Sequence, residues 1–288
     1  MSILSSKTNS EEDFIELGKL VKEIPWLAKK DYESSLPALF NTYNTESERV
    51  VLKELFRRFT HHESDDRLEA NDLLINIISE HNFKPNDTVF VATSDGKESD
   101  GSQSGLYQIK SLLGRQEADW KERNLLPVLD ESYDRIHQAG MKNIVVFDDF
   151  IGSGKTIVNK VNTLKAEMNN RGQKQRKYFV FSFVGMKFGV EYARDELGID
   201  IYCHTELTKG IVDHPNSQEI RKEVLNMEMS LLPKWNQLKI SDFSLGYKES
   251  EALYQLYMSN CSNNVLPIFW WKYDDNKNFR NPMFGRLR

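Results

Sequence analysis

The chain has 288 residues, of which 39% are hydrophobic and 28% are charged, a balance typical of a soluble globular protein. Its net charge of −5 gives no overall positive field that would favour nucleic acid, and its two cysteines, Cys203 and Cys261, offer neither a metal-type spacing nor a disulfide framework. The segment Met1–Phe14 lacks the apolar core of a secretory signal, and no apolar run is long enough to cross a membrane. We therefore expect a cytoplasmic protein with no membrane contact and no direct nucleic-acid binding.

The beginning of the chain predicts a polar tail followed by helices. Residues 1–12 are polar, and we expect them to be disordered. In residues 13–81 apolar side chains recur at helical spacing, and Pro25 and Pro37 punctuate the pattern. The three apolar stripes are Phe14, Leu17, Leu20, Val21 and Ile24; Val50, Val51, Leu52, Leu55, Phe56 and Phe59; and Leu68, Leu73, Leu74, Ile77 and Ile78. We expect a helical N-terminal region that leads into the main domain.

Residues 82–212 alternate between apolar runs and helical segments. The predicted strands are Thr88–Thr93, Ile144–Asp148, Tyr178–Val184 and Ile199–Cys203. Buried strands separated by helices are typical of a parallel sheet with right-handed crossovers. We predict an α/β core with a doubly wound, mainly parallel sheet. Residues 213–288 are helical at first and then irregular and aromatic, which predicts a C-terminal extension.

The most informative stretch is Asn143-Ile-Val-Val-Phe-Asp-Asp-Phe-Ile-Gly-Ser-Gly-Lys-Thr156. It predicts a buried strand that ends in two carboxylates, Asp148 and Asp149, followed by a Gly/Ser/Thr loop and an amphipathic helix. A helix N-terminus presents unpaired N–H groups and a partial positive charge, which suit a phosphate. Because a phosphate needs donors, the carboxylates indicate another part of the same ligand, such as the vicinal hydroxyls of a ribose.

A nucleoside-triphosphatase P-loop is the competing interpretation, because Gly154-Lys155-Thr156 ends like one. The P-loop pattern needs a glycine five positions before Gly154, and this chain has Asp149 there. A carboxylate at that position would repel the phosphates, and its Cβ would restrict the turn that glycine permits. We therefore favour a ribose-phosphate site, with an ordinary strand–turn–helix corner as a third interpretation.

Four apolar residues, two acids and a small-residue loop ending in threonine resemble the signature of type I phosphoribosyltransferases. The resemblance implies that Asp148 and Asp149 are catalytic, lie against the ribose hydroxyls of phosphoribosyl pyrophosphate and contact Mg²⁺ only through the ligand. It also implies a ribose-5-phosphate loop made of Ile151, Gly152, Ser153, Gly154, Lys155 and Thr156. Lys155 departs from the family pattern, in which a small residue is more usual at this position.

A second loop follows the predicted strand Thr88–Thr93. Ser94–Gly105 is rich in small and polar residues and leaves the carboxyl end of that strand, where open α/β sheets bind ligands. The family resemblance implies a pyrophosphate loop here, and its candidate residues are Ser94, Asp95, Gly96 and Lys97. The loop is longer and more acidic than the family's tight loop, so an ordinary solvated connection stays open as an alternative.

Between this loop and the acidic strand lies a segment with mixed charges. The resemblance implies a flexible basic loop that closes over pyrophosphate and excludes water, with Arg115, Lys121 and Arg123 as candidates. The acids Glu117 and Glu122 are interspersed with them, and opposite charges at such spacing are also typical of a solvated helix face.

The C-terminal part narrows the resemblance. Ser244–Leu253 and Asn263–Trp271 are similar to the closing motifs of the PRTase-CE group, the phosphoribosyltransferase-like domains of prokaryotic conflict systems. The stretch Glu48–Phe59 is similar to the group's helical lead-in, so the resemblance covers about residues 35–285. The group occurs in antiphage and retron-type gene neighbourhoods, which implies partner proteins of a defence system, such as a reverse transcriptase complex.

The extension is expected to act as a hood that recognises a base. Asn264 could read base edges and Trp270 or Trp271 could stack on a base, whereas burial in a core is the alternative for both tryptophans. Two histidines and an acid near the last predicted strand are weaker site candidates: His204, Asp213 and His214.

The motifs and the family resemblance together imply an enzyme that acts on phosphoribosyl pyrophosphate or nucleotides, with Mg²⁺ as cofactor. The reaction would be phosphoribosyl transfer or release of base or pyrophosphate. A non-catalytic sensor or assembly subunit that binds the same ligand is the alternative, because the unusual Ser94–Gly105 stretch leaves the pyrophosphate loop in question.

Overall fold

The computed structural model describes residues 11–96, 101–172 and 175–287. The chain divides into two compact units: the sheet unit (His62–Thr208) and the split unit (Met1–His61 with Lys209–Arg288). The split unit draws on both ends of the chain, so it combines parts of the predicted N-terminal region and of the predicted C-terminal extension. Residues 1–10 of the predicted tail lie outside the described residues, whereas Glu11 begins helix α1 (Glu11–Glu23).

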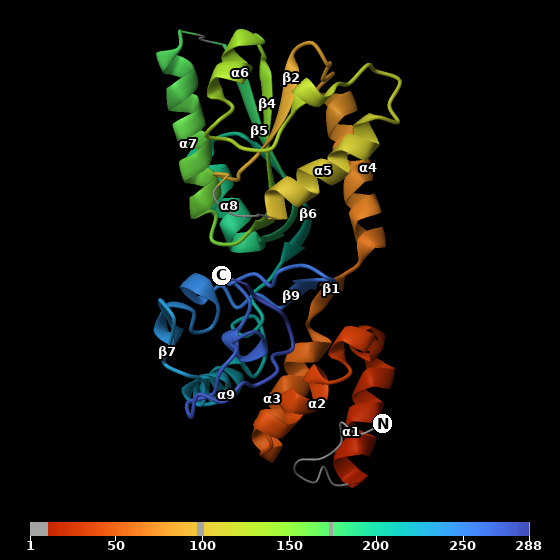
Figure 1. Ribbon diagram of the computed structural model, residues 1–288, viewed down its shortest axis with the longest axis vertical. Helices are drawn as coiled ribbons and strands as arrows, with labels where there is room; N and C mark the ends of the chain where they lie inside the picture. The colour runs from red at the N-terminus through yellow and green to blue at the C-terminus, as the bar shows by residue number, and fades with distance from the viewer. Residues whose placement is uncertain (1–10, 97–100, 173–174, 288) are drawn as a thin grey trace. The chain divides into compact units, whose positions relative to one another are not determined.

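The sheet unit contains a five-stranded parallel sheet with the order β3-β2-β4-β5-β6. Its strands are β2 (Thr88–Ala92), β3 (Leu125–Leu126), β4 (Asn143–Ile151), β5 (Lys177–Met186) and β6 (Asp200–Leu207). Its helices are α4 (Ser64–Glu80), α5 (Gly101–Leu113), α6 (Tyr133–Gln138), α7 (Lys155–Asn170) and α8 (Lys187–Leu197). Helices α4 and α5 cover one face of the sheet and α6, α7 and α8 cover the other (Figure 1). The predicted doubly wound α/β fold is confirmed.

Continuous apolar runs explain why these strands are central. All five residues of β2 are buried, as are Ile144–Phe147 of β4, and a strand covered by helices on both faces needs such a run. The four predicted strands are all present. The edge strand β3 escaped prediction because two residues, Leu125 and Leu126, are too few to show a period.

The chain order of the strands reverses at β2. The chain leaves β2 through α5 to reach β3 on one side, and it returns through α6 to β4 on the other side of β2. The loops that follow β2 and β4 therefore lead to opposite faces of the sheet, which is the arrangement at which open α/β sheets bind ligands. The N–H of Thr93 donates to the carbonyl of Phe147 at 3.0 Å, so the carboxyl ends of β2 and β4 lie side by side.

The predicted loop Ser94–Gly105 is wrong in its second half. Helix α5 begins at Gly101, so Ser102 and Ser104 are helical. The small and polar residues at the start of this helix have low helix propensity, so the sequence alone does not predict it. Tertiary packing outweighs that propensity here. Leu106 and Ile109 of α5 are buried.

The split unit is helical at its beginning and irregular after α9. Its further helices are α2 (Ser35–Thr42), α3 (Glu46–Arg57) and α9 (Ser217–Met229), and its short strands are β1 (Thr60–His62), β7 (Lys234–Trp235), β8 (Leu238–Lys239) and β9 (Tyr254–Leu256). Strand β1 pairs with β9, and β7 pairs with β8. Thr45 and Glu48 form a capping box at the start of α3, which fixes where that helix begins. None of the helices in the described part of the chain has the length and apolar character needed to span a bilayer.

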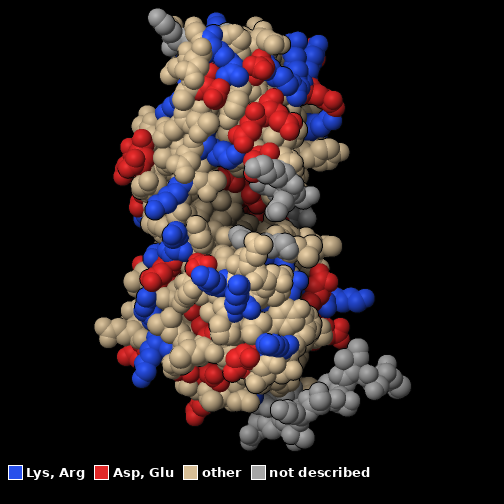
Figure 2. Space-filling view, turned by 60° about the vertical axis from the view of Figure 1, so that its left-hand side comes forward, with Lys and Arg blue, Asp and Glu red and all other residues tan. Residues whose placement is uncertain are grey.

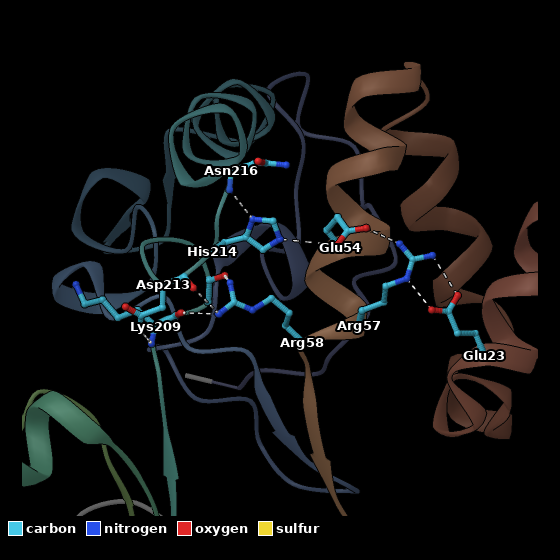
Figure 3. A network of polar contacts seen from close by, with 9 residues as sticks. Glu23, Glu54, Arg57, Arg58, Lys209, Asp213, His214 and Asn216 are labelled. Atoms are coloured by element: carbon cyan, nitrogen blue, oxygen red, sulfur yellow. Dashed lines mark hydrogen bonds and ion pairs between the residues drawn. The ribbon is translucent and has the colours of Figure 1, made fainter.

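Polar side chains hold the irregular backbone of the split unit. Arg58 donates to the carbonyls of Gly210 at 2.6 Å, Lys209 at 3.4 Å and Asp213 at 3.5 Å (Figure 3). The buried carboxylate of Glu251 accepts the neighbouring N–H groups of Ile211 at 3.0 Å and of Val212 at 2.7 Å. Carbonyls and amides of one turn are thus satisfied by two charged side chains, as buried backbone groups require.

Candidate active site

The loop between β4 and α7 has the geometry of an anion cradle. Gly154 is the N-cap of α7 with φ of 77°, a left-handed conformation that glycine adopts without strain. Gly154 accepts the N–H of Val158 at 3.0 Å, but it has no side chain to cap the first turn. The N–H groups of Lys155, Thr156 and Ile157 have no acceptor within the helix. They point out of the start of α7 beside the carboxyl end of β4, and they suit a phosphate.

The cradle is seated on α8 by direct backbone packing. A Cβ at Gly189 would overlap the carbonyl of Gly152 and lie 3.0 Å from the nitrogen of Gly154. A Cβ at Gly154 would in turn overlap the carbonyl of Gly189 and lie 3.0 Å from Cδ1 of Tyr192. Sequence reasoning missed Gly189, although an isolated glycine within a helical pattern is a signal of close packing. Because Gly189 has no side chain, the backbone of α8 can pack directly against the loop.

The side chains at the open end of the cradle are accessible. Lys155 and Thr156 are exposed, and Ser153 is half-buried, so each could reach a bound phosphate. Ile151 is buried in the apolar cluster of the sheet, so its contribution to the loop is its backbone. The visible face of each unit carries Lys and Arg side chains interspersed with Asp and Glu side chains, and no single sign of charge dominates it (Figure 2).

The acidic pair lies near the carboxyl end of β4, and its two side chains lie on opposite faces of the sheet. Ile144 and Val146 belong to the apolar cluster that includes Ile157 and Val161 of α7. Because side chains alternate along a strand, Asp148 continues this face, on the side of the cradle. Its side chain is half-buried.

Asp149 lies on the α5 face. Phe147 packs against Gly105, where a Cβ would lie 2.5 Å from its ring. Two residues further along β4, the carboxylate of Asp149 lies against Gly101, where a Cβ would overlap it. The two acids therefore have different surroundings although they are adjacent in the sequence.

The candidate pyrophosphate loop lies beside the acidic pair at the carboxyl end of β2. Ser94 is 2% exposed, and its hydroxyl accepts the N–H of Gly96 at 3.1 Å, which closes a tight turn. Gly96 has a positive φ of 77° and lies against Val128, while Asp95 and Gly96 are exposed. Lys97 lies outside the described residues. The topology thus brings Ser94–Gly96 to the end of β4, with the Ser94 hydroxyl engaged in the turn.

The flexible-loop candidates are not brought to this edge. Arg115, Lys121 and Arg123 follow the end of α5 and precede β3, at the opposite end of the sheet from the start of α7 (Figure 1). All three side chains are exposed, and Lys121 pairs with Asp119 at 3.1 Å. Their surroundings match the solvated alternative.

The base-site candidates belong to the core of the split unit. Trp270 and Trp271 are fully buried, and the indole N–H of Trp270 donates to the carbonyl of Val265 at 2.8 Å. Asn264 is 8% exposed and donates to the hydroxyl of Ser262 at 3.1 Å. Neither tryptophan presents a free face on which a base could stack, so burial in a core is the observed state.

The weaker candidates have structural partners. His214 accepts the N–H of Asn216 through Nδ1 at 3.0 Å and directs Nε2 toward Glu54 at 3.8 Å (Figure 3). Asp213 accepts the N–H of Lys209 at 2.8 Å (Figure 3). In the sheet unit, Nδ1 of His204 lies 3.0 Å from the hydroxyl of Thr205.

Neither cysteine is activated as a nucleophile. Burial raises the pKa of Cys203 to about 12 and that of Cys261 to about 12, so both thiols stay protonated at neutral pH. Among the described residues, no three His, Cys, Asp or Glu side chains converge to hold a metal ion.

Comparison with known proteins identifies one family. The family model PRTase-CE matches residues 26–286, which is most of the chain. No curated protein matches the chain.

Proposed function

The chain belongs to the PRTase-CE family, and we propose that it acts on phosphoribosyl pyrophosphate or a nucleotide at the carboxyl end of β4. A phosphoribosyltransferase-like domain is the coarser assignment that the family match supports. The observation that carries the proposal is the cradle: Gly154 leaves the first turn of α7 without a side-chain cap, and Asp148 lies on the same face of the sheet.

The ligand would be held at two points. The 5′-phosphate would accept hydrogen bonds from the N–H groups at the start of α7 and from the hydroxyls of Ser153 and Thr156. A ribose hydroxyl would donate to Asp148, whose negative charge would also favour the positive charge that develops at the anomeric carbon. Binding energy from the remote phosphate would then orient the reacting carbon.

The proposed reaction breaks the bond between the anomeric carbon and its leaving group. With phosphoribosyl pyrophosphate, pyrophosphate leaves with the bonding electrons, and a base nitrogen or water forms the new bond. We propose that Mg²⁺ binds together with the ligand beside Asp148, since Mg²⁺ sites commonly combine one or two carboxylates with substrate phosphates and no three His, Cys, Asp or Glu side chains converge among the described residues. When bound, Mg²⁺ would supply positive charge that neutralises the leaving group.

A paired substitution tests the proposal. Asp148→Asn with Asp149→Asn should abolish product formation from phosphoribosyl pyrophosphate or nucleotides, with products identified by mass spectrometry. A matched control changes the exposed acids of α8, Asp195→Asn with Glu196→Gln, and should leave turnover intact. Unchanged turnover in the Asp148/Asp149 variant would refute the assignment.

A non-catalytic binding subunit is the second candidate. Ser94 favours it, because its hydroxyl accepts the N–H of Gly96 and its side chain is buried, which leaves that hydroxyl turned into the loop. Saturable binding of phosphoribosyl pyrophosphate in calorimetry, with no product in the same mass spectrometry panel, would select the sensor over the enzyme.

A role in antiphage defence is part of the proposal, with partner proteins that include a reverse transcriptase complex if the system is a retron. Expression of the wild-type chain together with its gene neighbours should restrict phage growth, and the Asp148/Asp149 variant should not. Restriction that persists in this variant would separate any defence role from the site.

A further inference from the structure

We propose that Asp149 is a positioning residue that fixes the start of α5, and that Asp148 alone of the pair faces the ligand. This inference rests on the proposed function for its ligand, but its structural basis is independent of any ligand. The basis is the contact of two β4 side chains, Phe147 and Asp149, with two glycines of α5.

The spacing of these contacts matches the rise of the helix and the rise of the strand. Gly101 and Gly105 are four residues apart, which is a rise of about 6 Å in an α-helix. Phe147 and Asp149 are two residues apart, which is roughly 6.6 Å along a parallel strand. Phe147 packs against Gly105 and Asp149 against Gly101, so the helix lies along the strand in one register.

The contacts also explain why both helix positions are glycine. A Cβ at Gly105 would lie 2.5 Å from the Phe147 ring and 3.0 Å from Cε2 of Phe183, and a Cβ at Gly101 would overlap the Asp149 carboxylate. A larger residue at Gly105 would push α5 away from the Phe147 ring, and one at Gly101 would displace the Asp149 carboxylate from the helix start. Ser102, beside Gly101, is fully buried, so the first turn of α5 is packed tightly against the sheet.

Electrostatics favours the same role for Asp149. The first N–H groups of α5 have no acceptor within the helix, and the helix start carries a partial positive charge. A carboxylate beside Gly101 is placed where its negative charge would stabilise that end of the helix. A negative group already held there is poorly placed to serve a ribose on the opposite face of β4.

The consequence for the site is that Asp149 acts through α5. Helix α5 packs on β2 as well as on β4, and the turn Ser94–Gly96 follows β2 directly, so a shift of α5 is expected to reach that turn. Loss of Asp149 is therefore expected to affect the part of a ligand that meets the β2 loop. Loss of Asp148 is expected to affect the ribose-phosphate part.

Hydrogen exchange in the ligand-free protein tests the structural half. Asp149→Ala and Gly101→Ala should each speed exchange of the α5 amides about tenfold, because a lost N-terminal partner loosens the helix. Asp149→Asn keeps a carbonyl oxygen but removes the charge, so it should speed exchange less than Asp149→Ala does. Gly114→Ala is the matched control, because a Cβ there comes no closer than 3.4 Å to the Lys110 carbonyl. Wild-type protection of α5 in both Asp149→Ala and Gly101→Ala would overturn the inference.

Calorimetry with two ligands tests the functional half. Asp148→Asn should weaken ribose 5-phosphate and phosphoribosyl pyrophosphate alike, by about tenfold or more. Asp149→Ala should change the affinity for phosphoribosyl pyrophosphate and leave that for ribose 5-phosphate within about twofold. Equal losses of ribose 5-phosphate binding in Asp148→Asn and Asp149→Ala would overturn the division of roles. If the wild-type protein bound neither ligand, the proposed function would fail, while the exchange result would still decide the position of Asp149.

Discussion

The sheet unit pairs most of its backbone polar groups with one another along regular strands, whereas the irregular split unit relies more on charged side chains that are buried or half-buried. In the sheet unit, four parallel pairings connect five strands. In the split unit, strand pairs are short, and Arg58, Glu228, Glu251 and Arg280 each bond to backbone groups. A regular sheet needs only apolar residues at the right period, whereas an irregular chain needs a specific polar partner at each turn.

Backbone conformation follows the same division. Among the described residues, nine that are not glycine have a positive φ, and all except Asn82 lie in the split unit between Asn236 and Asn281. In the sheet unit the other positive values belong to glycines, including Gly96 and Gly154 at the two site loops. A left-handed residue with a side chain costs free energy, so the split unit depends more on its side-chain bonds to the backbone.

The largest expected effect comes from removing a buried charge of the split unit. Arg280 donates to the carbonyl of Trp271 at 3.1 Å, to that of Ile268 at 3.2 Å and to the hydroxyl of Tyr43 at 2.8 Å. Arg280→Met would leave these buried acceptors without a donor and should lower the free energy of unfolding by about 3–5 kcal/mol.

Urea unfolding followed by tryptophan fluorescence measures this change. Four of the five tryptophans lie in the split unit, so their emission reports mainly on that unit. Lys234→Met, at an exposed position in the same unit, is the control and should change stability by less than about 0.5 kcal/mol. Equal midpoints for Arg280→Met and Lys234→Met would contradict the role given to buried charges.

The second effect depends on pH and involves Glu228. Burial raises the pKa of Glu228 to about 7, although its carboxylate accepts bonds from the hydroxyl of Ser244 at 2.5 Å and from the N–H of Leu245 at 2.9 Å. The folded state therefore holds a proton that the unfolded chain has released, so stability falls as the pH rises from about 4.5 through 7. The fall is roughly 3 kcal/mol at about 1.4 kcal/mol for each pKa unit.

Glu228→Gln keeps an acceptor for Leu245 and carries no charge. The variant should therefore lose this part of the pH dependence and be more stable than the wild type above pH 7. Fluorescence-detected unfolding between pH 5 and 8 gives the comparison, with Asp275→Asn, an exposed acid of the same unit, as the control. Parallel pH profiles for the wild type and Glu228→Gln would contradict the prediction.

The same division explains what the sequence could predict. The apolar run of β4, its acidic end and the following glycines are local in the sequence, so the parallel sheet and the loop Gly152–Thr156 could be predicted from them. The seat of that loop on Gly189 could not, because it joins two helices through backbone atoms. The different surroundings of Asp148 and Asp149 also depend on α5, whose start at Gly101 is hidden among small and polar residues.

The aromatic residues of the split unit show where the sequence suggests a site that the structure does not provide. Trp270 and Trp271 stand out in the sequence and suggest a stacking site, but the structure buries both. Composition gives the chemical capacity of a side chain, and burial decides whether a ligand can use it. Arg115, Lys121 and Arg123 illustrate the same limit, since topology sets the edge of the sheet at which a loop lies.

A third, smaller effect tests the backbone seat in the sheet unit. Gly189→Ala would force its Cβ against the carbonyl of Gly152 and should cost about 1–3 kcal/mol of stability through overpacking. Hydrogen exchange of β4 and α7 should locate the loss at the cradle. Gly18→Ala is the control in α1, where a Cβ meets nothing within 4 Å, and it should stabilise by about 0.5–1 kcal/mol. Destabilisation of similar size in both variants would show a general helix effect and contradict the seat.

The smallest effect concerns the left-handed residues of the split unit. Lys277 is exposed and has φ of 66°, so its side chain strains the backbone. Lys277→Gly relieves that strain at the cost of a more flexible unfolded chain, and the net gain should be about 0.5 kcal/mol. Lys239→Gly, at an exposed strand residue with φ of −106°, should instead lose about 0.5–1 kcal/mol, because no strain is relieved there. Urea midpoints of the two variants should therefore shift in opposite directions, and a shift of the same sign would mean that the left-handed residues are not a source of strain in the split unit.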